Sequence, residues 1–316
     1  MLHKFEPATQ HVYRSRFRNW NSRAAVRSKP LPEFCGREVK LFFSPELVAL
    51  AQHPLVQSRG DAVIREILAY HLLGHLNFTD ALETEIIAPV ACMIGRGQFE
   101  LPFTPAMLTD ARKIAVDEMY HALFTGGLVE EISAAAGVRP FAKHRPSFLL
   151  ELDSIKAELS TSLTSLVDFF FATVSETLIT ATLTRVPNDE RVASGVRTIL
   201  RDHAEDEARH HLYFSDALMM TWPALTPGLR RHIGPLLPRF ITMFLTPDLL
   251  HAQHCLARIA LSATEAESVI EEVYSPVLVQ ADIRARSETV IRIMQRAGVL
   301  EDPQAEDAFR SVGLID

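Results

Sequence analysis

The sequence predicts an all-α fold, a bundle of four long helices with accessory helices at its N- and C-terminal sides. Apolar residues recur with helical periodicity along most of the chain, and the alternation typical of strands is hard to find. Glycine is scarce, at 13 of 316 residues, and the 18 prolines fall mainly between the periodic stretches. We therefore expect long helices that are interrupted mainly at prolines.

The long helices are expected at 61–94, 105–136, 148–185 and 187–220. A proline-bearing connection at 139–146 separates them into two pairs, which indicates a bundle built from two helical hairpins. Residues 221–250 are richer in proline and predict short helices, with longer ones after Thr246. A hydroxyl residue before proline can cap a helix whose first turn holds the proline, and this pattern occurs at Ser44-Pro45, Thr104-Pro105, Thr246-Pro247 and Ser275-Pro276.

The organisation predicted is a single domain over residues 1–316. An irregular basic arm occupies 1–45, the four-helix core 61–220 and the accessory helices 221–316. No internal repeat or low-complexity tract divides the chain. Hydrophobic residues at 47% and charged residues at 22% are ordinary for a protein with a sizeable core.

The charge balance argues against nucleic acid as a partner, because the formal net charge is −7. Residues 1–40 carry nine basic and three acidic side chains, so this arm is at +6 and the rest of the chain at −13. We expect the arm to be a solvated segment lying on an acidic body.

Cysteine usage and hydropathy indicate the cellular compartment of the protein. Three widely spaced cysteines form no disulfide framework or zinc knuckle. No apolar run approaches the roughly 18 residues of a membrane span, and no secretion-type apolar segment follows Met1. We expect a cytoplasmic protein with no membrane partner.

The motif that carries chemistry is Asp-Glu-x-x-His, which occurs at Asp117-Glu118…His121 and again at Asp206-Glu207…His210. A single Glu-x-x-His is a weak signal, but two copies of the longer pattern are not expected by chance in a chain of this length. Glu and His at positions i and i+3 lie on one face of a helix. Each copy therefore presents a carboxylate and an imidazole in the same direction.

A further glutamate precedes each motif by the length of one helix and its turn. Glu83 lies 35 residues before Glu118, and Glu176 lies 31 residues before Glu207. These gaps return the chain to the same level on an antiparallel neighbour, so four carboxylates and two imidazoles converge inside the bundle. Burying four carboxylates together costs too much free energy unless cations neutralise them. Two divalent metals balance these charges, so the charge balance favours a redox site with two metals over a single zinc or magnesium ion. Oxygen and nitrogen ligands suit iron or manganese.

The two aspartates also have an expected role. A ligating histidine usually donates its second ring N–H to a carboxylate. We predict that each aspartate bonds the histidine of the other hairpin, Asp117 with His210 and Asp206 with His121. His203 lies four residues before Glu207 and seven before His210, on the same helical stripe. From this spacing alone it is either a third nitrogen ligand, or a histidine that contacts the ligands or faces solvent.

Together these residues resemble the di-iron N-oxygenase family typified by p-aminobenzoate N-oxygenase (AurF-type). The resemblance extends from the stretch around Trp20 to the C-terminal helices and is strongest at seven positions, which all match: Glu83, Glu118, His121, Glu176, His203, Glu207 and His210. It implies a ferritin-like bundle with two iron ions, manganese being the alternative, and makes His203 a ligand. It further implies that Glu118 and Glu207 bridge the irons, that Glu83 and His121 complete one, and that Glu176, His203 and His210 complete the other. A homodimer is also expected.

Other residues near the motifs receive weaker assignments. Glu85 is two residues from Glu83, which turns it toward another face of the helix. Thr173 and Thr180 lie one turn on either side of Glu176 and are candidates for lining a substrate pocket, as is His75 on the Glu83 helix.

The function expected from these residues and the resemblance is O₂-dependent N-oxygenation, by a non-haem di-iron monooxygenase in natural-product biosynthesis. The substrate would be a small primary aryl amine, converted through hydroxylamine toward a nitroso or nitro compound. No part of the sequence resembles a flavin or nicotinamide fold, so an external donor would supply electrons. The alternatives are the same chemistry on an aliphatic or amino-acid-derived amine, an iron-oxidising ferritin-like protein, a C–H hydroxylase and a manganese catalase.

Overall fold

The described part of the protein is all-α, as predicted. The computed structural model describes residues 11–30, 40–140, 145–178 and 185–316. Within these ranges, extended backbone pairs only at an isolated bridge between Leu41 and Val192. None of the helices in these ranges combines the length and apolar character that crossing a membrane requires.

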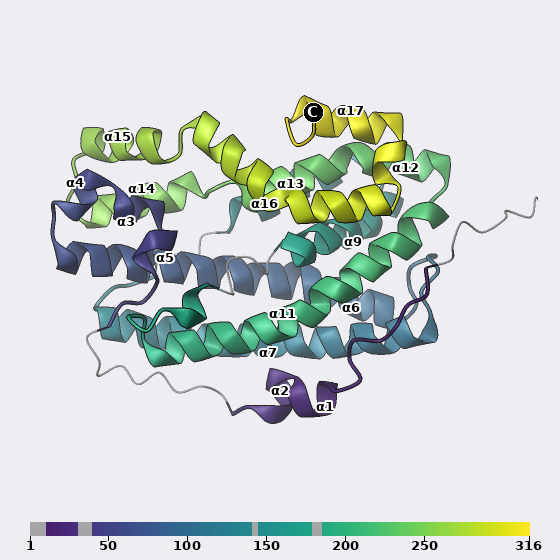
Figure 1. The fold of residues 1–316 in the computed structure, drawn as a ribbon, viewed down its shortest axis with the longest axis horizontal. Coiled ribbons are helices and arrows are strands. Elements are labelled where there is room, and N and C mark those ends of the chain that lie inside the picture. Colours follow the sequence, from purple (N-terminus) through teal and green to yellow (C-terminus); the bar gives the residue numbers. More distant parts are fainter. Residues whose placement is uncertain (1–10, 31–39, 141–144, 179–184) are drawn as a thin grey trace, which may run out of the picture.

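Four long helices form the centre of the molecule (Figure 1). The first runs as α5 (Asp61–Leu82), a π-helical turn η2 (Glu83–Ile87) and α6 (Ala88–Gly95), and the others are α7 (Pro105–Ala136), α9 (Thr161–Leu178) and α11 (Ser194–Thr221). α7 packs along α5 and α6, and α9 packs along α11. Contacts of α11 with α7, and of α6 with α9, join the two hairpins into one bundle.

The π-helical turn in the first helix was not predicted, although Pro89 in the sequence was a signal for it. Proline has no N–H to donate and its ring clashes with the carbonyl one turn earlier, so a helix must widen or bend before it. The turn begins at Glu83 and ends two residues before Pro89. Single π-turns of this kind often occur at functional sites, and here the turn carries a predicted metal ligand.

Two predicted helix boundaries were wrong. The third helix is not continuous from 148 but is divided into α8 (Ser147–Ala157) and α9. Three consecutive hydroxyl residues, 160–162, lie where the break ends and α9 begins, and such residues favour turns and helix starts over helix interiors. The fourth helix begins at Ser194 and not at Pro187, which belongs to the short turn η3 (Val186–Asn188).

The accessory helices pack on the four-helix core and are a mixture of short and longer elements, as predicted. They are η1 (Pro45–Leu47), α3 (Ala49–Gln52), α4 (Pro54–Gln57), η4 (Trp222–Ala224), α12 (Pro227–Ile233), η5 (Gly234–Leu236), α13 (Leu237–Leu245), α14 (Leu249–Arg258), α15 (Ala263–Val273), α16 (Pro276–Arg296), η6 (Val299–Glu301) and α17 (Pro303–Ser311). α14 packs on α5, and α16 packs on α9 and α11.

The hydroxyl-proline pattern predicted three of four helix starts. Proline occupies the first turn after Ser44, Thr104 and Ser275, and the Thr104 hydroxyl accepts from the backbone N–H of Met107 at 3.3 Å. After Thr246 the prediction was wrong, because α14 begins at Leu249. There the side chain of Asp248 provides the cap by accepting a hydrogen bond from the backbone N–H of His251 at 3.0 Å.

The N-terminal arm lies on the acidic body as predicted, but it is not solvated throughout. It contains two short helices, α1 (Trp20–Arg23) and α2 (Ala25–Ser28), beside α7 and α11 (Figure 1). Phe17 and Ala24 are fully buried there. The composition of the arm concealed this packing, because a few apolar side chains anchor a segment that is otherwise basic.

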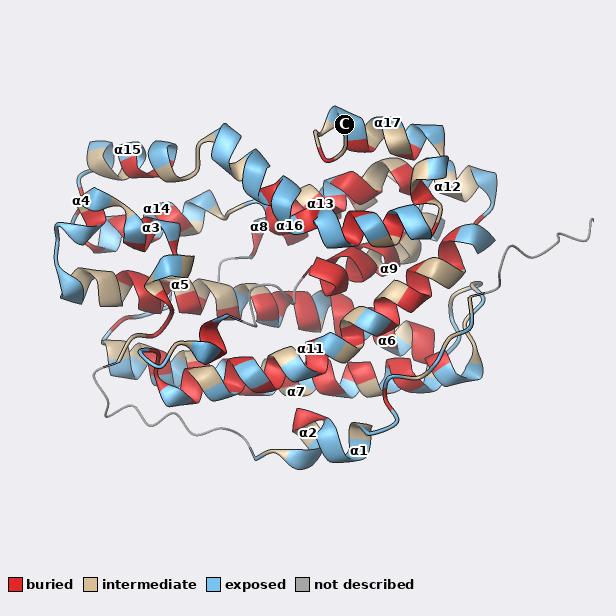
Figure 2. Ribbon diagram, in the orientation of Figure 1, coloured by how far each residue is buried: buried red, intermediate tan, exposed pale blue. Residues whose placement is uncertain are grey.

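The interior is formed by the facing sides of the long helices, which are buried along most of their length (Figure 2). The run Phe169-Phe170-Phe171 on α9 is completely buried and packs with other aromatic rings, among them Trp222. This aromatic packing fixes the helix that carries Glu176.

Candidate metal centre

The seven predicted ligands converge in the middle of the bundle in two groups that share one carboxylate. One group contains Glu83, His121, His203 and Glu207, and the other Glu118, Glu176, Glu207 and His210. Within each group the potential ligand atoms all lie within 4.8 Å of one another. All seven side chains are buried, with at most 2% of their surface exposed.

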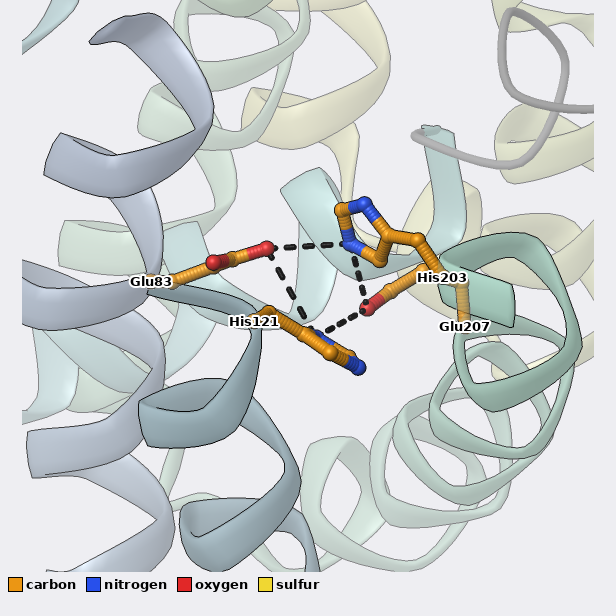
Figure 3. A group of neighbouring side chains, drawn as sticks. All are labelled: Glu83, His121, His203 and Glu207. Carbon is orange, nitrogen blue, oxygen red and sulfur yellow. Dashed lines mark ion pairs between the residues drawn. The ribbon is translucent and has the colours of Figure 1, made fainter. Parts of the chain in front are cut away.

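The first group joins three of the four core helices (Figure 3). His203 Nε2 lies 3.0 Å from Glu83 Oε1 and 3.2 Å from Glu207 Oε1. His121 Nδ1 lies 3.7 Å from Glu83 Oε1 and 3.6 Å from Glu207 Oε1. Two nitrogens and two carboxylates thus surround one point.

The second group lies along the bundle from the first. His210 Nδ1 is 2.7 Å from Glu118 Oε1, 3.3 Å from Glu207 Oε1 and 3.8 Å from Glu176 Oε2. His121 Nδ1 also lies 3.7 Å from Glu118 Oε2, so Glu118 reaches toward both groups. Glu118 and Glu207 are therefore the carboxylates placed between the two positions.

The carboxylate oxygens and imidazole nitrogens that could bind metal at this centre have no hydrogen-bond partners among the described residues. Both carboxylate oxygens of Glu83, Glu118 and Glu207 are in this state, as are Glu176 Oε2, His121 Nδ1, His203 Nε2 and His210 Nδ1. Buried polar atoms are normally paired, because leaving them unpaired destabilises the fold. Four carboxylates and three imidazole nitrogens that face one another without hydrogen-bond partners fit two divalent metal ions of the iron or manganese type.

Electrostatics without metal show the same need for cations. Burial and the neighbouring carboxylates of Glu207 and Glu118 raise the pKa of Glu176. Burial opposes the charge on His210, yet Glu207 and Glu118 raise the pKa of its imidazole. The centre thus retains protons to offset its negative charge, and metal ions would displace them.

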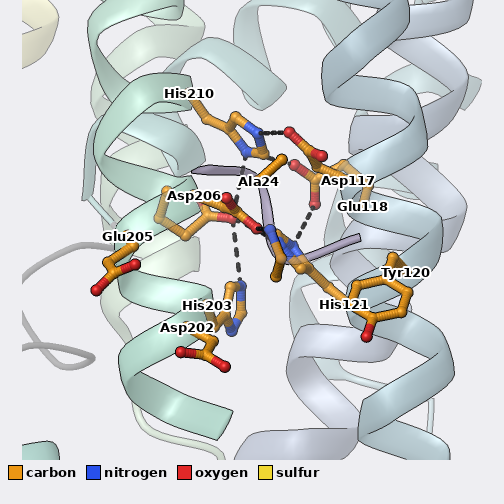
Figure 4. Close-up of polar contacts among 12 residues, drawn as sticks. Ala24, Asp117, Glu118, Tyr120, His121, Asp202, His203, Glu205, Asp206 and His210 are labelled. Atoms are coloured by element: carbon orange, nitrogen blue, oxygen red, sulfur yellow. Dashed lines mark hydrogen bonds and ion pairs between the residues drawn. The ribbon is translucent and has the colours of Figure 1, made fainter. Parts of the chain in front are cut away.

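The predicted cross-pairing of aspartates and histidines is present (Figure 4). His121 Nε2 lies 3.1 Å from Asp206 Oδ2, and His210 Nε2 lies 3.3 Å from Asp117 Oδ2. With the Nε2 N–H of each ring directed at the aspartate of the other motif, Nδ1 faces the centre, where it would bind a metal ion once any proton on it is displaced.

The arm supports both aspartates, and the sequence did not reveal this. Trp20 donates its indole N–H to Asp117, with Nε1 2.9 Å from each carboxylate oxygen. The backbone N–H of Ala25 donates to Asp206 Oδ2 at 3.2 Å, and Arg209 also donates to Asp206. These hydrogen bonds join residues that are 97 and 181 positions apart in the sequence, so no periodic pattern indicates them. The only feature of the sequence that could have suggested them was a tryptophan within a basic segment.

A family model described as P-aminobenzoate N-oxygenase AurF matches residues 6–298. The chain belongs to this family. A search of curated proteins finds no match. The AurF family has a ferritin-like di-iron helical fold and is a family of oxygenases, so the four-helix architecture predicted from the sequence is confirmed and the protein is an enzyme of this family.

One detail of the expected ligand distribution differs in this AurF-family protein. The resemblance implied that His203 joins Glu176 and His210, but the structure places His203 in the group of Glu83 and His121. The reason is helical rise: His203 precedes His210 by seven residues, about 10 Å along α11. It consequently lies at the end of the centre opposite to His210.

The remaining sequence assignments fall in different places. Glu85 points away from the centre, as predicted, and accepts a hydrogen bond from Arg145 at 3.1 Å. Thr173 is buried on α9, one turn before Glu176, but its hydroxyl donates to the backbone oxygen of Phe169 at 2.8 Å. His75 lines a cavity next to the centre. Thr180 lies outside the described residues.

Proposed function

We propose that this AurF-family protein is an O₂-dependent non-haem di-iron N-oxygenase that oxidises a primary aryl amine in natural-product biosynthesis. The observation that carries the proposal is the pair of buried ligand groups that share Glu207. Three imidazole nitrogens face the carboxylates of these groups, one more than the two that the repeated motifs supply, and the third belongs to His203.

The seven residues would hold two iron ions, which supply the redox chemistry that activates O₂. Around them the protein's own residues have defined tasks. Asp117 and Asp206 hold the tautomers of His210 and His121 so that Nδ1 of each ring faces a metal position. The apolar walls of the bundle exclude water, which protects reactive species from hydrolysis.

The reaction balances with an external reductant. One oxygen atom of O₂ enters an N–H bond of the amine and gives a hydroxylamine, while the other leaves as water. Two electrons and two protons come from the donor and solvent. A second O₂ with two more electrons and protons converts the hydroxylamine to the nitroso compound and two waters. A third O₂ with the same reductant converts the nitroso compound to the nitro compound and one water.

The test is product analysis with ¹⁸O₂. Protein loaded anaerobically with Fe(II) and mixed with ¹⁸O₂, a chemical reductant and a panel of aryl amines should give N-oxygenated products that carry ¹⁸O. Products from aliphatic amines alone would move the substrate to that class. Ferric iron without any N-oxygenated product would overturn the proposal in favour of an iron-oxidising protein.

A homodimer is the oligomeric state we propose. An exposed apolar row on α7 supports it, formed by Val116, Met119 and Leu123 at 45%, 54% and 59% exposure. Exposed apolar rows of this kind are common at subunit interfaces. Light scattering coupled to gel filtration should give twice the chain mass of 35.4 kDa, and a monomer mass would refute it.

A further inference from the structure

A cavity of about 860 Å³ adjoins the metal centre on the side of the accessory helices. Its walls come from α5 and α7 of the core and from α13, α14 and α16. An apolar cavity of roughly 150 Å³ is enough to hold one benzene molecule. The cavity is therefore several times larger than an amine with a single ring requires.

The cavity is elongated along α5. Ile67, His71, His75 and Thr79 all line it and recur every four residues, so they lie on one face of the helix. Thr79 follows Ile67 by 12 residues, and this face is consequently about 18 Å long at 1.5 Å per residue. Thr79 marks the end nearest the metal centre, and Ile67 the end remote from it.

At its inner end the cavity lies one helical turn from the predicted metal ligands. Thr79 lies one turn before Glu83 on the first helix, and Thr125 lies one turn after His121 on the antiparallel α7, which brings both threonines to the same level. Both line the cavity, both are at most 2% exposed, and neither hydroxyl has a hydrogen-bond partner among the described residues. An unprotonated amino group at this end would supply both partners, because it has N–H donors and a lone pair.

Beyond the threonines the walls of the cavity are largely apolar. Phe43, Phe78 and Phe244 line it together with Ile67. His71 also lines it and is neutral near pH 7, because burial lowers its pKa to about 3. Aromatic walls with a few polar groups are typical of sites for planar apolar ligands.

Charge on the described residues of the lining is confined to paired or exposed groups. Arg286 pairs with Asp282, with Nη1 3.3 Å from Oδ2, and Asp248 accepts a backbone N–H at the start of α14. The other two carboxylates of the lining, Asp80 and Glu130, are exposed. These groups leave the interior of the cavity suited to the apolar part of a ligand.

α14 covers the cavity at the middle of the α5 face. The ring of His251 lies against α5, with Nε2 3.1 Å from the backbone oxygen of Tyr70 and so close to Gly74 that a Cβ atom there would overlap it. Tyr70 and Gly74 precede Thr79 by nine and five residues, about 14 and 8 Å along the helix. Ala252, the residue after His251, is buried and lines the cavity. It therefore lies farther from the metal centre than the first ring of a ligand that starts at the threonines.

We propose that this cavity is the amine-binding chamber and that its substrate is an elongated arylamine, whose amino-bearing ring continues into an apolar body along α5. The inference rests on the proposed N-oxygenase function. The amino nitrogen lies at the hydroxyls of Thr79 and Thr125, and the body extends past Ala252 toward Ile67. A one-ring amine would occupy only the inner part of the chamber and would not bury apolar surface against the remaining walls.

A series of 4-alkylanilines tests the length of the chamber without any turnover. Equilibrium dialysis of the full-length protein, loaded anaerobically with Fe(II), compares aniline with its 4-ethyl, 4-butyl and 4-hexyl derivatives. We expect the dissociation constant to fall about two- to fourfold for each added methylene as far as 4-butylaniline, because each methylene leaves water for the apolar walls. Affinity that stops rising at 4-ethylaniline, or no binding of any member, would overturn the proposal.

A variant on α14 tests where the alkyl chain lies. Ala252→Phe adds a ring beyond the first ring of the ligand, so we expect 4-hexylaniline to bind about tenfold more weakly or worse and aniline to bind as before. The control is Ala257→Phe, at an exposed position of the same helix that does not line the cavity, and it should change neither. Equal weakening of both ligands by Ala252→Phe, or unchanged binding of the long one, would contradict the placement along α5.

A second pair of variants does not depend on the stability of Ala252→Phe. Gly126 lines the cavity, and a Cβ atom there would meet no other atom within 4 Å. Gly126→Leu should therefore weaken binding of 4-butylaniline about tenfold or more by occupying this space. Gly127→Leu, whose Cβ also meets open space but which does not line the cavity, should leave it unchanged. The same effect in both variants would place the ligand outside the chamber.

Replacing the amino group tests the two threonines. The protein should bind 4-butylaniline about two- to tenfold more tightly than 4-butyltoluene, in which a methyl group takes the place of the amino group. The double variant Thr79→Val/Thr125→Val should lose this preference. Thr177→Val, whose hydroxyl donates to backbone oxygens and does not line the cavity, should keep it. A preference that survives in the double variant would show that the amino group lies elsewhere.

Dialysis and product analysis distinguish the two proposals. Binding that strengthens with chain length, without N-oxygenated product from any member of the series, would leave the chamber in place and refute the N-oxygenase function. Product formed from aniline with the same kcat/KM as from 4-butylaniline would support the function and refute the elongated substrate.

Discussion

Two sides of the metal centre are covered in opposite ways, although both covering segments come from outside the four-helix core. On the side of α7 and α11, the N-terminal arm donates hydrogen bonds to the aspartates that hold the histidines. On the side of α5, the accessory helices enclose a cavity in which two buried threonine hydroxyls remain unpartnered. A site that must hold metals rigidly and also admit a substrate needs both kinds of cover.

The arm makes further polar contacts besides those to Asp117 and Asp206. Tyr13 donates to Asp110 at 2.8 Å, and Lys29 donates to Asp202 and Glu205 at 2.5 and 2.8 Å. Phe17 stacks on the ring of His210, with centroids 6.0 Å apart. These contacts hold α7 and α11 at the level of their proposed ligands, whereas the proposed ligand Glu83 lies on the π-helical turn η2, which follows the cavity-lining helix α5.

The largest expected effect tests the arm side. Asp117→Asn removes the carboxylate that holds His210, and we expect Fe(II) affinity at one of the two positions to fall about 10- to 100-fold. Anaerobic Fe(II) titration measures this. Asp110→Asn is the matched control, because Asp110 is also buried on α7 and bonded to an arm aromatic residue but contacts no predicted ligand. Equal losses in both variants would contradict the proposed role of Asp117.

A smaller effect should follow from removing the arm's own contribution. Trp20→Phe keeps an aromatic ring, although a smaller one, and deletes the N–H that bonds Asp117. We expect a roughly two- to tenfold loss of Fe(II) affinity, confined to the position that contains His210, because the aspartate remains but is less well oriented. Loss at both positions, measured by the same titration, would show that the arm acts by holding the fold together.

The cavity side should respond in the opposite direction. Thr125→Val removes an unpartnered buried hydroxyl, so we expect the free energy of unfolding to rise by up to about 1 kcal/mol with Fe(II) affinity unchanged. Thr177→Val removes a hydroxyl that donates to two backbone oxygens and should not stabilise. Denaturant unfolding compares the two. If Thr125→Val destabilises more than Thr177→Val, the Thr125 hydroxyl is bonded rather than free.

The smallest effect concerns acid stability on the cavity side. Burial lowers the pKa of His71 to about 3, with His75 and His251 adding repulsion. The unfolded chain therefore binds a proton near pH 6.5 that the folded protein does not, so His71 reduces stability as pH falls below 6.5. Between pH 7.5 and 6 this loss is below about 1 kcal/mol. His71→Gln should show a correspondingly weaker acid dependence in denaturant unfolding, and an unchanged dependence would refute it.

Helical spacing made much of this architecture predictable. The positions of Glu83, Glu118, Glu176 and Glu207 follow from helix length, and the pairing of each aspartate with the opposite histidine follows from how metal-bound imidazoles are held. Both signals are local or repeat along the sequence, so they were visible without the structure.

The features that escaped prediction depend on contacts between distant segments. Nothing near Trp20 in the sequence indicates that its indole reaches Asp117, and nothing around Thr79 or Thr125 indicates that their hydroxyls border a cavity. The grouping of His203 depends on where along the bundle each ligand level lies. That register is set by the packing of whole helices, which the spacing of one helix cannot supply.

The most direct test of the account is anomalous X-ray diffraction at the iron edge from crystals of the Fe(II)-loaded protein. We predict two iron peaks per chain that share Glu207. One lies among Glu83, His121 and His203, and the other lies among Glu118, Glu176 and His210. A single peak, or a pair in which His203 binds the iron held by Glu176 and His210, would contradict the arrangement described above.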